Sequence, residues 1–122
     1  MLRNILAEDL IHPAIRDTIA RHHQDIVSEV QAAISQHNVV VVGMKQNPHP
    51  KKARKALTAH GTPFHYLEYG SYLNHWRRRN ALKMWTGWPT FPMVFVKGSL
   101  VGGYTDLQRL IGSGELKRLL GE

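Results

Sequence analysis

Residues 88–103 have the sequence Trp-Pro-Thr-Phe-Pro-Met-Val-Phe-Val-Lys-Gly-Ser-Leu-Val-Gly-Gly. Two short apolar runs, 93–96 and 100–102, flank the turn residues Lys97-Gly98-Ser99, a pattern that predicts an antiparallel β-hairpin. Phe91 precedes Pro92, which confines its backbone to extended geometry. The segment therefore enters the hairpin through a restrained, proline-rich loop.

A second strand pair is predicted upstream of this hairpin. Residues 39–44 form a continuous, β-branched run that is typical of a strand buried on both faces. Asn47-Pro48 predicts a helix start, with Asn as N-cap and Pro at the first helical position. The helix ends at Gly61-Thr62-Pro63, and residues 64–69 form the next strand. Two strands joined by a helix imply a parallel, right-handed βαβ unit.

Helical periodicity accounts for most of the remaining chain. Apolar residues recur at helical spacing between Ala14 and Gln36, which fits one long helix or two shorter ones. Further helices are predicted at 72–85, 105–111 and 115–120. In the helix at 72–85 the expected core anchors are Leu73, Trp76, Leu82 and Trp85. We expect residues 1–12 to form an arm and residues 13–122 to form a single domain.

The composition excludes several kinds of chemistry. The chain has 122 residues, a net charge of +7 and no cysteine, so it has no disulfide, zinc–thiolate site, thiolate-held iron–sulfur cluster or cysteine nucleophile of its own. Its histidine pair, His22-His23, does not converge on one ion, because adjacent side chains on a helix point about 100° apart, and we expect no metal site. No apolar run approaches the ~18 residues of a membrane span. Glu8 and Asp9 interrupt the N-terminus where a signal peptide would be apolar, so we expect a cytoplasmic protein.

Positive charge is concentrated in the middle of the chain. Between Val30 and Thr105 there are ten Lys or Arg residues and a single acid, Glu68. These cations either form solvated helix faces or an anion site for a small acidic ligand or a nucleic-acid backbone. Lys51 and Lys52 lie near a helix N-terminus, where the helix dipole disfavours cations and a bound anion would relieve the cost.

The order of elements resembles that of a thioredoxin-like domain, and three segments are similar to the glutaredoxin family, especially its monothiol branch. Residues 79–92 match an Arg-x-x-Leu-Lys-x-aromatic-Ser/Thr-x-Trp-Pro-Thr-x-Pro pattern. Residues 95–107 match the family's strand–turn–strand and Gly-Gly-x-Ser/Asp-Asp-Leu signature, and residues 113–116 match its C-terminal helix. The resemblance implies an α/β thioredoxin-like fold: a four-stranded mixed sheet flanked by helices, here with an additional N-terminal helix.

The resemblance also implies a glutathione-binding groove. In the family the bond before the proline that corresponds to Pro92 is cis, and a peptide-like ligand pairs with the backbone beside it. A glycine pair before a helix N-terminus suits the carboxylate of the γ-glutamyl end, although Thr105 and Gln108 also fit an ordinary capping box. By position, the expected ligand-binding residues are Lys45, Arg79, Thr90, Phe91, Pro92, Gly103, Tyr104, Thr105 and Asp106.

The departure from the family lies where relatives carry Cys-x-x-Cys or Cys-Gly-Phe-Ser. Counting back from the following helix places Asn47 in the position of the nucleophile and Pro50 in that of the resolving cysteine, whereas counting forward from Lys45 reaches Pro48. Neither residue offers a thiolate, which thiol–disulfide exchange and cluster ligation both need. His49, beside them, is more simply an exposed loop histidine than an acid, a base or a metal ligand.

Three functions follow from these features. The first is a redox-inactive glutaredoxin-like module that binds glutathione, a glutathionylated protein or another protein partner in a regulatory role. The second is an enzyme with glutathione-dependent disulfide oxidoreductase-type activity that uses the ligand's own thiol beside Lys45 or His49. The third is a basic nucleic-acid-binding module that uses the cations near Lys51 and Arg78. No iron–sulfur cluster and no membrane association are expected.

Overall fold

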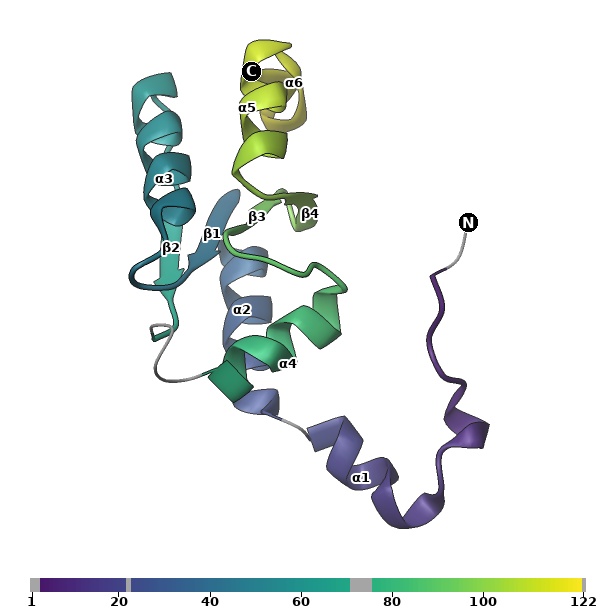
Figure 1. Ribbon diagram of the computed structural model, residues 1–122. Helices are drawn as coiled ribbons and strands as arrows, with labels where there is room; N and C mark the ends of the chain where they lie inside the picture. Colours follow the sequence, from purple (N-terminus) through teal and green to yellow (C-terminus); the bar gives the residue numbers. More distant parts are fainter. Residues whose placement is uncertain (1–2, 22, 71–75, 122) are drawn as a thin grey trace.

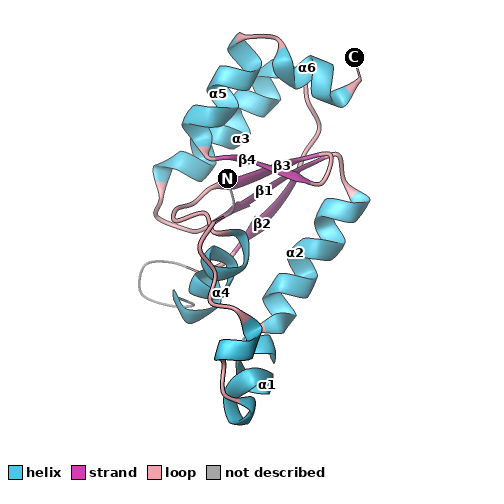
Figure 2. Ribbon diagram, turned by 90° about the vertical axis from the view of Figure 1, so that its right-hand side faces the viewer, coloured by secondary structure: helices cyan, strands magenta, loops and turns pink. Residues whose placement is uncertain are grey.

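The computed structural model describes residues 3–21, 23–70 and 76–121. Its centre is a four-stranded sheet with the order β2-β1-β3-β4, shown edge-on in Figure 2. The strands are β1 (Val39–Gly43), β2 (His65–Glu68), β3 (Met93–Val96) and β4 (Ser99–Gly102). β1 pairs in parallel with β2 and antiparallel with β3, which in turn pairs antiparallel with β4. The predicted βαβ unit, hairpin and thioredoxin-like fold are confirmed.

Helices cover both faces of this sheet (Figures 1 and 2). Helices α3, α5 and α6 lie on one face, and helices α2 and α4 lie on the other. Their bounds are α2 (Gln24–Gln36), α3 (Pro48–His60), α4 (Trp76–Thr86), α5 (Tyr104–Gly112) and α6 (Glu115–Leu120). None of the helices in the described part of the chain is long and apolar enough to cross a membrane.

The β-branched run of β1 fills both layers of the core. Val39 and Val41 pack toward α3, α5 and α6, whereas Val40 and Val42 pack toward α2 and α4. All four are almost completely buried. Each buried side chain of this size contributes about 1.5–3 kcal/mol relative to an exposed one, so β1 is the strand on which both helix layers assemble.

The helical pattern between residues 14 and 36 is divided between two helices, α1 (Pro13–Arg21) and α2. Ile26 and Val30 of α2 are fully buried, but Ile15 and Ile19 of α1 are 51% and 49% exposed. The helical spacing of apolar residues therefore continues into α1, although the apolar residues Ile15 and Ile19 are not buried there.

Helix α4 corrects one predicted core anchor. The expected start at residues 72–75, with Leu73, lies outside the described residues. Trp76 is 54% exposed, and the buried face of α4 is instead formed by Ala81, Leu82 and Arg79. Trp85 is half-buried against the core, as expected, with its ring centroid 6.4 Å from that of Phe95. The prediction for Trp76 was wrong because Trp76 lies at the first position of α4, outside its buried face, where the Arg77 guanidinium lies 5.1 Å from its ring centroid.

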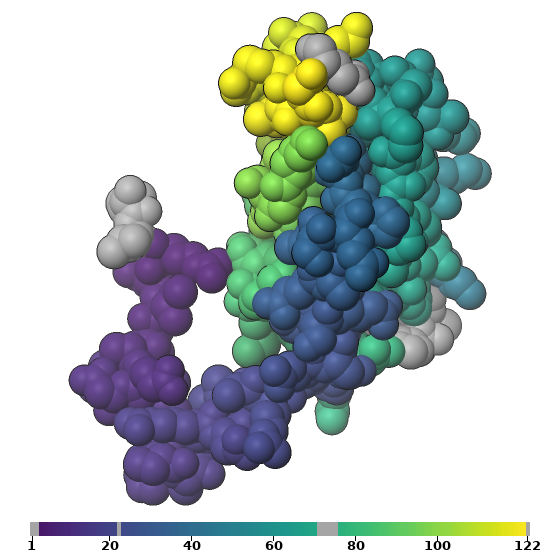
Figure 3. Space-filling view, turned by 180° about the vertical axis from the view of Figure 1, so that it is seen from behind, coloured from purple at the N-terminus to yellow at the C-terminus, as the bar shows by residue number. Residues whose placement is uncertain are grey.

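The N-terminal stretch contains a short 3₁₀ helix, η1 (Glu8–Leu10), before α1. Figure 3 shows this stretch and α1 projecting from the body of the protein, with a gap between much of the arm and the helices. At its beginning, Arg3 donates a hydrogen bond to the carbonyl oxygen of Thr86 (3.0 Å). Arg3 thereby satisfies a carbonyl at the C-terminus of α4, where cations are also favoured by the helix dipole.

Candidate functional site

The candidate site begins at the N-terminus of α3, directly after β1. Asn47 is the N-cap: its backbone is extended, and its Oδ1 accepts a hydrogen bond from the backbone N–H of His49 (3.0 Å). Pro48 occupies the first helical position, where no N–H is needed. The helix start predicted from the sequence is therefore confirmed, and the cap fixes the orientation of the Asn47 side chain.

The other end of the Asn47 amide reaches the loop that precedes β3. Its Nδ2 donates a hydrogen bond to the carbonyl oxygen of Phe91, across 3.2 Å. The Phe91–Pro92 peptide bond is cis, as the family resemblance implied. The Phe91 side chain is only 4% exposed and packs in the core. One amide thus caps a helix and binds a backbone carbonyl 44 residues away.

The N-terminus of α5 completes the site. The helix begins at Tyr104, with Gly103 as N-cap, and Asp106 Oδ2 accepts a hydrogen bond from the Gly103 N–H (3.0 Å). The expected capping box of Thr105 and Gln108 was wrong. The Gly103 carbonyl already accepts the first helical hydrogen bond, from Leu107, so Thr105 lies exposed inside the first turn.

A glycine is required just before this turn. Gly102 has φ +117°, and a Cβ built on it would lie 2.5 Å from Asp106 Oδ2. Gly103 is less restricted: a Cβ there would lie 3.5 Å from the Pro92 carbonyl oxygen and 3.7 Å from Trp88 Nε1. The start of α5 is therefore packed directly against the loop of the cis bond.

The two helix N-termini face the same region. The His49 ring of α3 lies 6.4 Å from the Tyr104 ring of α5, centroid to centroid. The first-turn N–H groups of α5 have no intrahelical partner, whereas α3 begins with Pro48 and Pro50 and the Asn47 side chain already accepts the His49 N–H. Because each N-terminus also carries about half a positive charge, the junction favours an anion, bound chiefly by the N–H groups of α5. The sequence predicted the start of α3 and placed that of α5 one residue late, but their proximity follows only from the fold.

Cations border this junction. Lys45 is exposed, and its backbone N–H donates to the Gly70 carbonyl (2.7 Å). With Asn47, Lys51, Arg54 and Glu68 it lines an open hollow of ≈ 380 Å³. On the other side of the cis loop, Lys83 Nζ lies 5.8 Å from the centre of the Phe91 ring. Lys83 was missed as a site residue, although it belongs to the motif at 79–92.

Arg79 occupies a different environment from the other expected ligand-binding residues. It is 5% exposed, and its Nη1 donates to the carbonyl oxygen of Tyr69 (3.1 Å). The guanidinium thus binds the backbone just after β2, next to Gly70, which holds Lys45. Its position supports the loop of Lys45 from inside the protein.

The remaining expected site residues are placed as follows. Thr90 and Thr105 are exposed, Pro92 is buried, and Tyr104 and Asp106 are half-buried. Pro50 is buried against β1, where a Cβ on Gly43 would lie 2.7 Å from the Pro50 Cβ. A residue at position 50 therefore faces the sheet.

Trp88 is a wall of the site that we had not counted among the ligand-binding residues. Its backbone N–H donates to Thr86 Oγ1 (3.1 Å), which fixes the loop after α4. Its indole Nε1 is buried and has no hydrogen-bond partner within the described part of the chain. The sequence signal is the Trp-Pro pair at 88–89, which belongs to the motif at 79–92.

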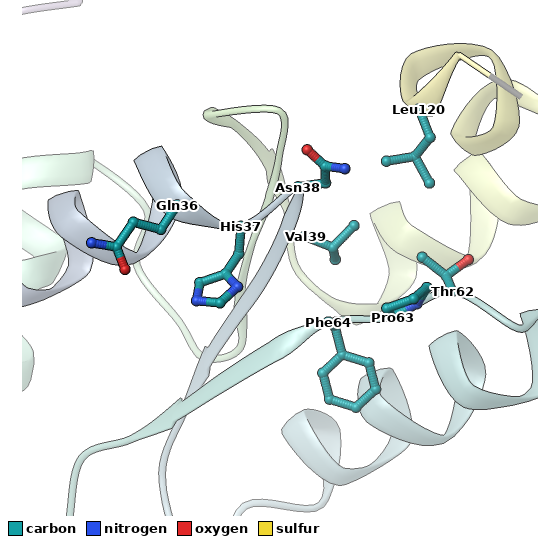
Figure 4. Close-up of a pocket in the computed structure, with 8 residues that line it drawn as sticks. All are labelled: Gln36, His37, Asn38, Val39, Thr62, Pro63, Phe64 and Leu120. Atoms are coloured by element: carbon teal, nitrogen blue, oxygen red, sulfur yellow. The ribbon is translucent and has the colours of Figure 1, made fainter.

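A second hollow, of ≈ 340 Å³, lies at the opposite end of β1 (Figure 4). His37, Thr62, Phe64 and Leu120 are among the residues around it, and His37 stacks on His65 with ring centroids 4.3 Å apart. Within the described residues, no group of three or more His, Asp or Glu side chains could hold a metal ion. Nothing there resembles the charged junction of α3 and α5.

Comparison with known proteins gives a consistent result. The glutaredoxin family profile matches residues 39–101. A glutaredoxin-like protein of Dictyostelium discoideum is 46% identical over 102 residues, which cover 84% of this chain and 83% of that protein. Oxidized glutaredoxin 2 from Chlamydomonas reinhardtii superposes with a TM-score of 0.68 at 27% identity, covering 81% of this chain and 94% of that one. A buckwheat glutaredoxin–glutathione complex has the same fold (TM-score 0.70, 21% identity, covering 83% and 92%).

Proposed function

Because this chain belongs to the glutaredoxin family and contains no cysteine, we propose that it binds glutathione, or a glutathione group carried by a protein, without redox chemistry. Thiol–disulfide exchange needs a thiolate that attacks sulfur, and no side chain here supplies one. The function proposed is therefore recognition, in a regulatory or adaptor role. A cluster-bridged dimer that depends on a cysteine ligand from this chain is not expected.

Asn47 is proposed to stand in the position of the lost nucleophile. It caps the helix that follows β1 and lies 3.2 Å from the carbonyl before the cis proline. Pro50, three residues later, is proposed to stand in the resolving position. Its burial against β1 supports a packing role for it.

The observation that carries the proposal is the meeting of two helix N-termini beside the cis Phe91–Pro92 bond. Glutathione has two carboxylates and one ammonium group, so it is a net anion at neutral pH. We assign its γ-glutamyl end to the start of α5, at Gly103, Thr105 and Asp106. The first-turn N–H groups after Gly103 suit a carboxylate, the Gly103 N–H being already donated to Asp106, and the Asp106 carboxylate suits the ammonium. The name of the buckwheat complex supports glutathione as the ligand class.

The glycine end of the ligand is assigned to the basic side of the hollow, at Lys45. Arg79 then acts as a positioning residue, because its guanidinium holds the Tyr69 carbonyl beside the Gly70–Lys45 hydrogen bond. Thr90 and Tyr104 border the ligand as exposed and half-buried walls.

Calorimetric titration with reduced glutathione tests this proposal. The expected result is saturable binding that is equal for S-methylglutathione, because no thiol chemistry is involved. Charge reversal at one proposed end, Lys45→Glu, and an added negative charge at the other, Thr105→Glu, should each weaken binding by about tenfold or more. Lys97→Glu, in the exposed β3–β4 turn, is the matched control and should leave binding unchanged.

Three outcomes would overturn the proposal. The absence of binding heat at millimolar glutathione would exclude glutathione as the ligand. Equal losses of affinity in Lys45→Glu and Lys97→Glu would show that binding depends on the net charge of the protein and not on a site at Lys45. Sustained turnover in a glutathione-coupled disulfide reduction assay, lost in His49→Ala, would show an enzyme instead of a binding module.

A further inference from the structure

A second basic surface runs along α3 and adjoins, at Lys51 and Arg54, the hollow beside Lys45. Here α3 and β2 enclose an open groove of ≈ 550 Å³. Phe64, Tyr66 and Ala59 supply apolar surface, and three cations stand along its border: Lys51, Arg54 and Lys55. No acidic residue is among the described residues that line it.

The central cation of this groove is held in place. The Arg54 guanidinium lies over the Tyr66 ring, with Cζ 4.0 Å from the ring centroid, a favourable cation–π geometry. Arg54 Nε is buried and has no hydrogen-bond partner among the described residues. The guanidinium is thus pre-organised and keeps a donor for an additional acceptor.

One carboxylate borders the groove. Glu68 accepts a hydrogen bond from the Tyr66 hydroxyl (3.1 Å) and lines the neighbouring hollow with Lys51 and Arg54, but it is not among the residues that line the groove. The three cations therefore outnumber the one bordering acid beside an apolar floor. The shape and charge suit an anionic chain that carries apolar side chains.

The groove also adjoins an edge of the sheet. β2 is the last strand on its side in the order β2-β1-β3-β4, so no further strand of the described residues pairs with its outer edge. Edge strands offer backbone groups to an extended peptide. An extended segment laid along β2 would pass over Phe64 and Tyr66 and reach the cations of α3.

We propose that this groove binds an acidic, extended segment of a partner protein, with large apolar side chains seated on Phe64 and Tyr66 and carboxylates paired with Lys51, Arg54 and Lys55. The inference is independent of glutathione binding. Lys51 and Arg54 also line the hollow beside Lys45, so a partner in the groove would lie next to the proposed glutathione site.

Fluorescence anisotropy tests the proposal on the full chain without glutathione. The probe is a fluorescein-labelled peptide of glutamates around a central Leu-Leu pair. Replacing the two leucines with alanines should weaken binding about tenfold or more, because apolar burial is lost. The double variant Lys51→Glu/Lys55→Glu should weaken binding by at least the same factor.

The matched control is Lys52→Glu/Lys117→Glu, which reverses the same number of charges at exposed positions outside the groove. It should bind the peptide nearly as the unchanged protein does, and circular dichroism verifies that both double variants fold. Tyr66→Leu, which keeps an apolar floor but removes the ring under Arg54, should weaken binding of the Leu-Leu peptide.

Three results would overturn the proposal: no binding of the Leu-Leu peptide, equal loss in the two double variants, or tighter binding of a single-stranded RNA of equal charge. The last result would identify a phosphate-binding surface. Tyr66 lines the groove but not the hollow at Lys45, so weaker peptide binding by Tyr66→Leu with unchanged glutathione binding, and the reverse for Lys45→Glu, separates this inference from the proposed function.

Discussion

The side-chain amide of Asn47 donates a hydrogen bond to the carbonyl oxygen of Phe91 across 3.2 Å, while its oxygen caps α3. Asn47→Ala removes both interactions and should lower the free energy of unfolding by about 1–3 kcal/mol. Asn47→Ser keeps a capping oxygen and loses only the amide donor to Phe91, so its loss should be smaller. Urea unfolding measures the stability of both variants. An unchanged free energy of unfolding in Asn47→Ala would show that the link between α3 and the cis loop is not stabilising.

Restoring a cysteine tests which position is that of the lost nucleophile. In Asn47→Cys the new thiol lies at the N-cap of α3, where the helix dipole stabilises a thiolate. We expect it to form a mixed disulfide with oxidised glutathione, as measured by mass spectrometry, faster than Pro48→Cys does. Faster reaction of Pro48→Cys would instead support the alignment that counts forward from Lys45.

The glycine before α5 is required for two separable reasons. Gly98 has φ +81° with open space around it, so Gly98→Ala measures backbone strain alone, about 1 kcal/mol. Gly102→Ala adds a collision with the Asp106 side chain and should cost about 2–4 kcal/mol. In the double variant with Asp106→Ala the contacts with Oδ2 and Cγ disappear and only the Cβ contact, at 2.9 Å, remains, so the two losses should be less than additive. Equal losses of stability in Gly98→Ala and Gly102→Ala would contradict the collision between residue 102 and the Asp106 side chain.

The Tyr66 side chain should make the stability of the protein fall at alkaline pH. Burial of its hydroxyl, then its hydrogen bond and repulsion from Glu68, raise the Tyr66 pKa from its usual 10.0 to about 12, against an opposing effect of Arg54. Because the folded-state pKa is the higher one, the stabilisation is complete below pH ~10 and is lost as the pH rises toward ~12. Urea midpoints should fall over this range, and Tyr66→Phe should reduce the slope. If Tyr66→Phe leaves the pH dependence of the urea midpoint unchanged, the loss of stability arises from another group. Tyr69 is the next candidate, because its pKa is also raised.

Arg79 should matter more for folding than its neighbour Arg78. Arg79→Ala leaves the Tyr69 carbonyl without this buried donor and should cost about 2–3 kcal/mol. Arg78→Ala breaks a partly exposed ion pair with Asp25 and should cost less than about 1 kcal/mol. Thermal unfolding of the two variants measures the difference, and a smaller loss at Arg79 would contradict a structural role.

The local elements were predictable because their signals are local. The β-branched run of β1, the turn at Lys97–Ser99 and the Asn47-Pro48 helix start each depend on residues a few positions apart. The prediction for Trp76 failed for the converse reason, since periodicity indicates which side of a helix is apolar but not where the core ends. The predicted α5 cap at Thr105 failed because the helix begins at Tyr104, with Gly103 as N-cap and Asp106 as the acceptor of its N–H.

The order of strands and helices, the family and the absence of a thiol follow from the residues alone, because they depend on residue identity and short-range pattern. The meeting of the α3 and α5 starts, the hydrogen bond from Asn47 to Phe91 and the burial of Arg79 follow from the packed fold. Such contacts join residues far apart in the chain. They arise when both helix layers pack on the sheet, and no periodicity along the sequence specifies which loops that packing brings together.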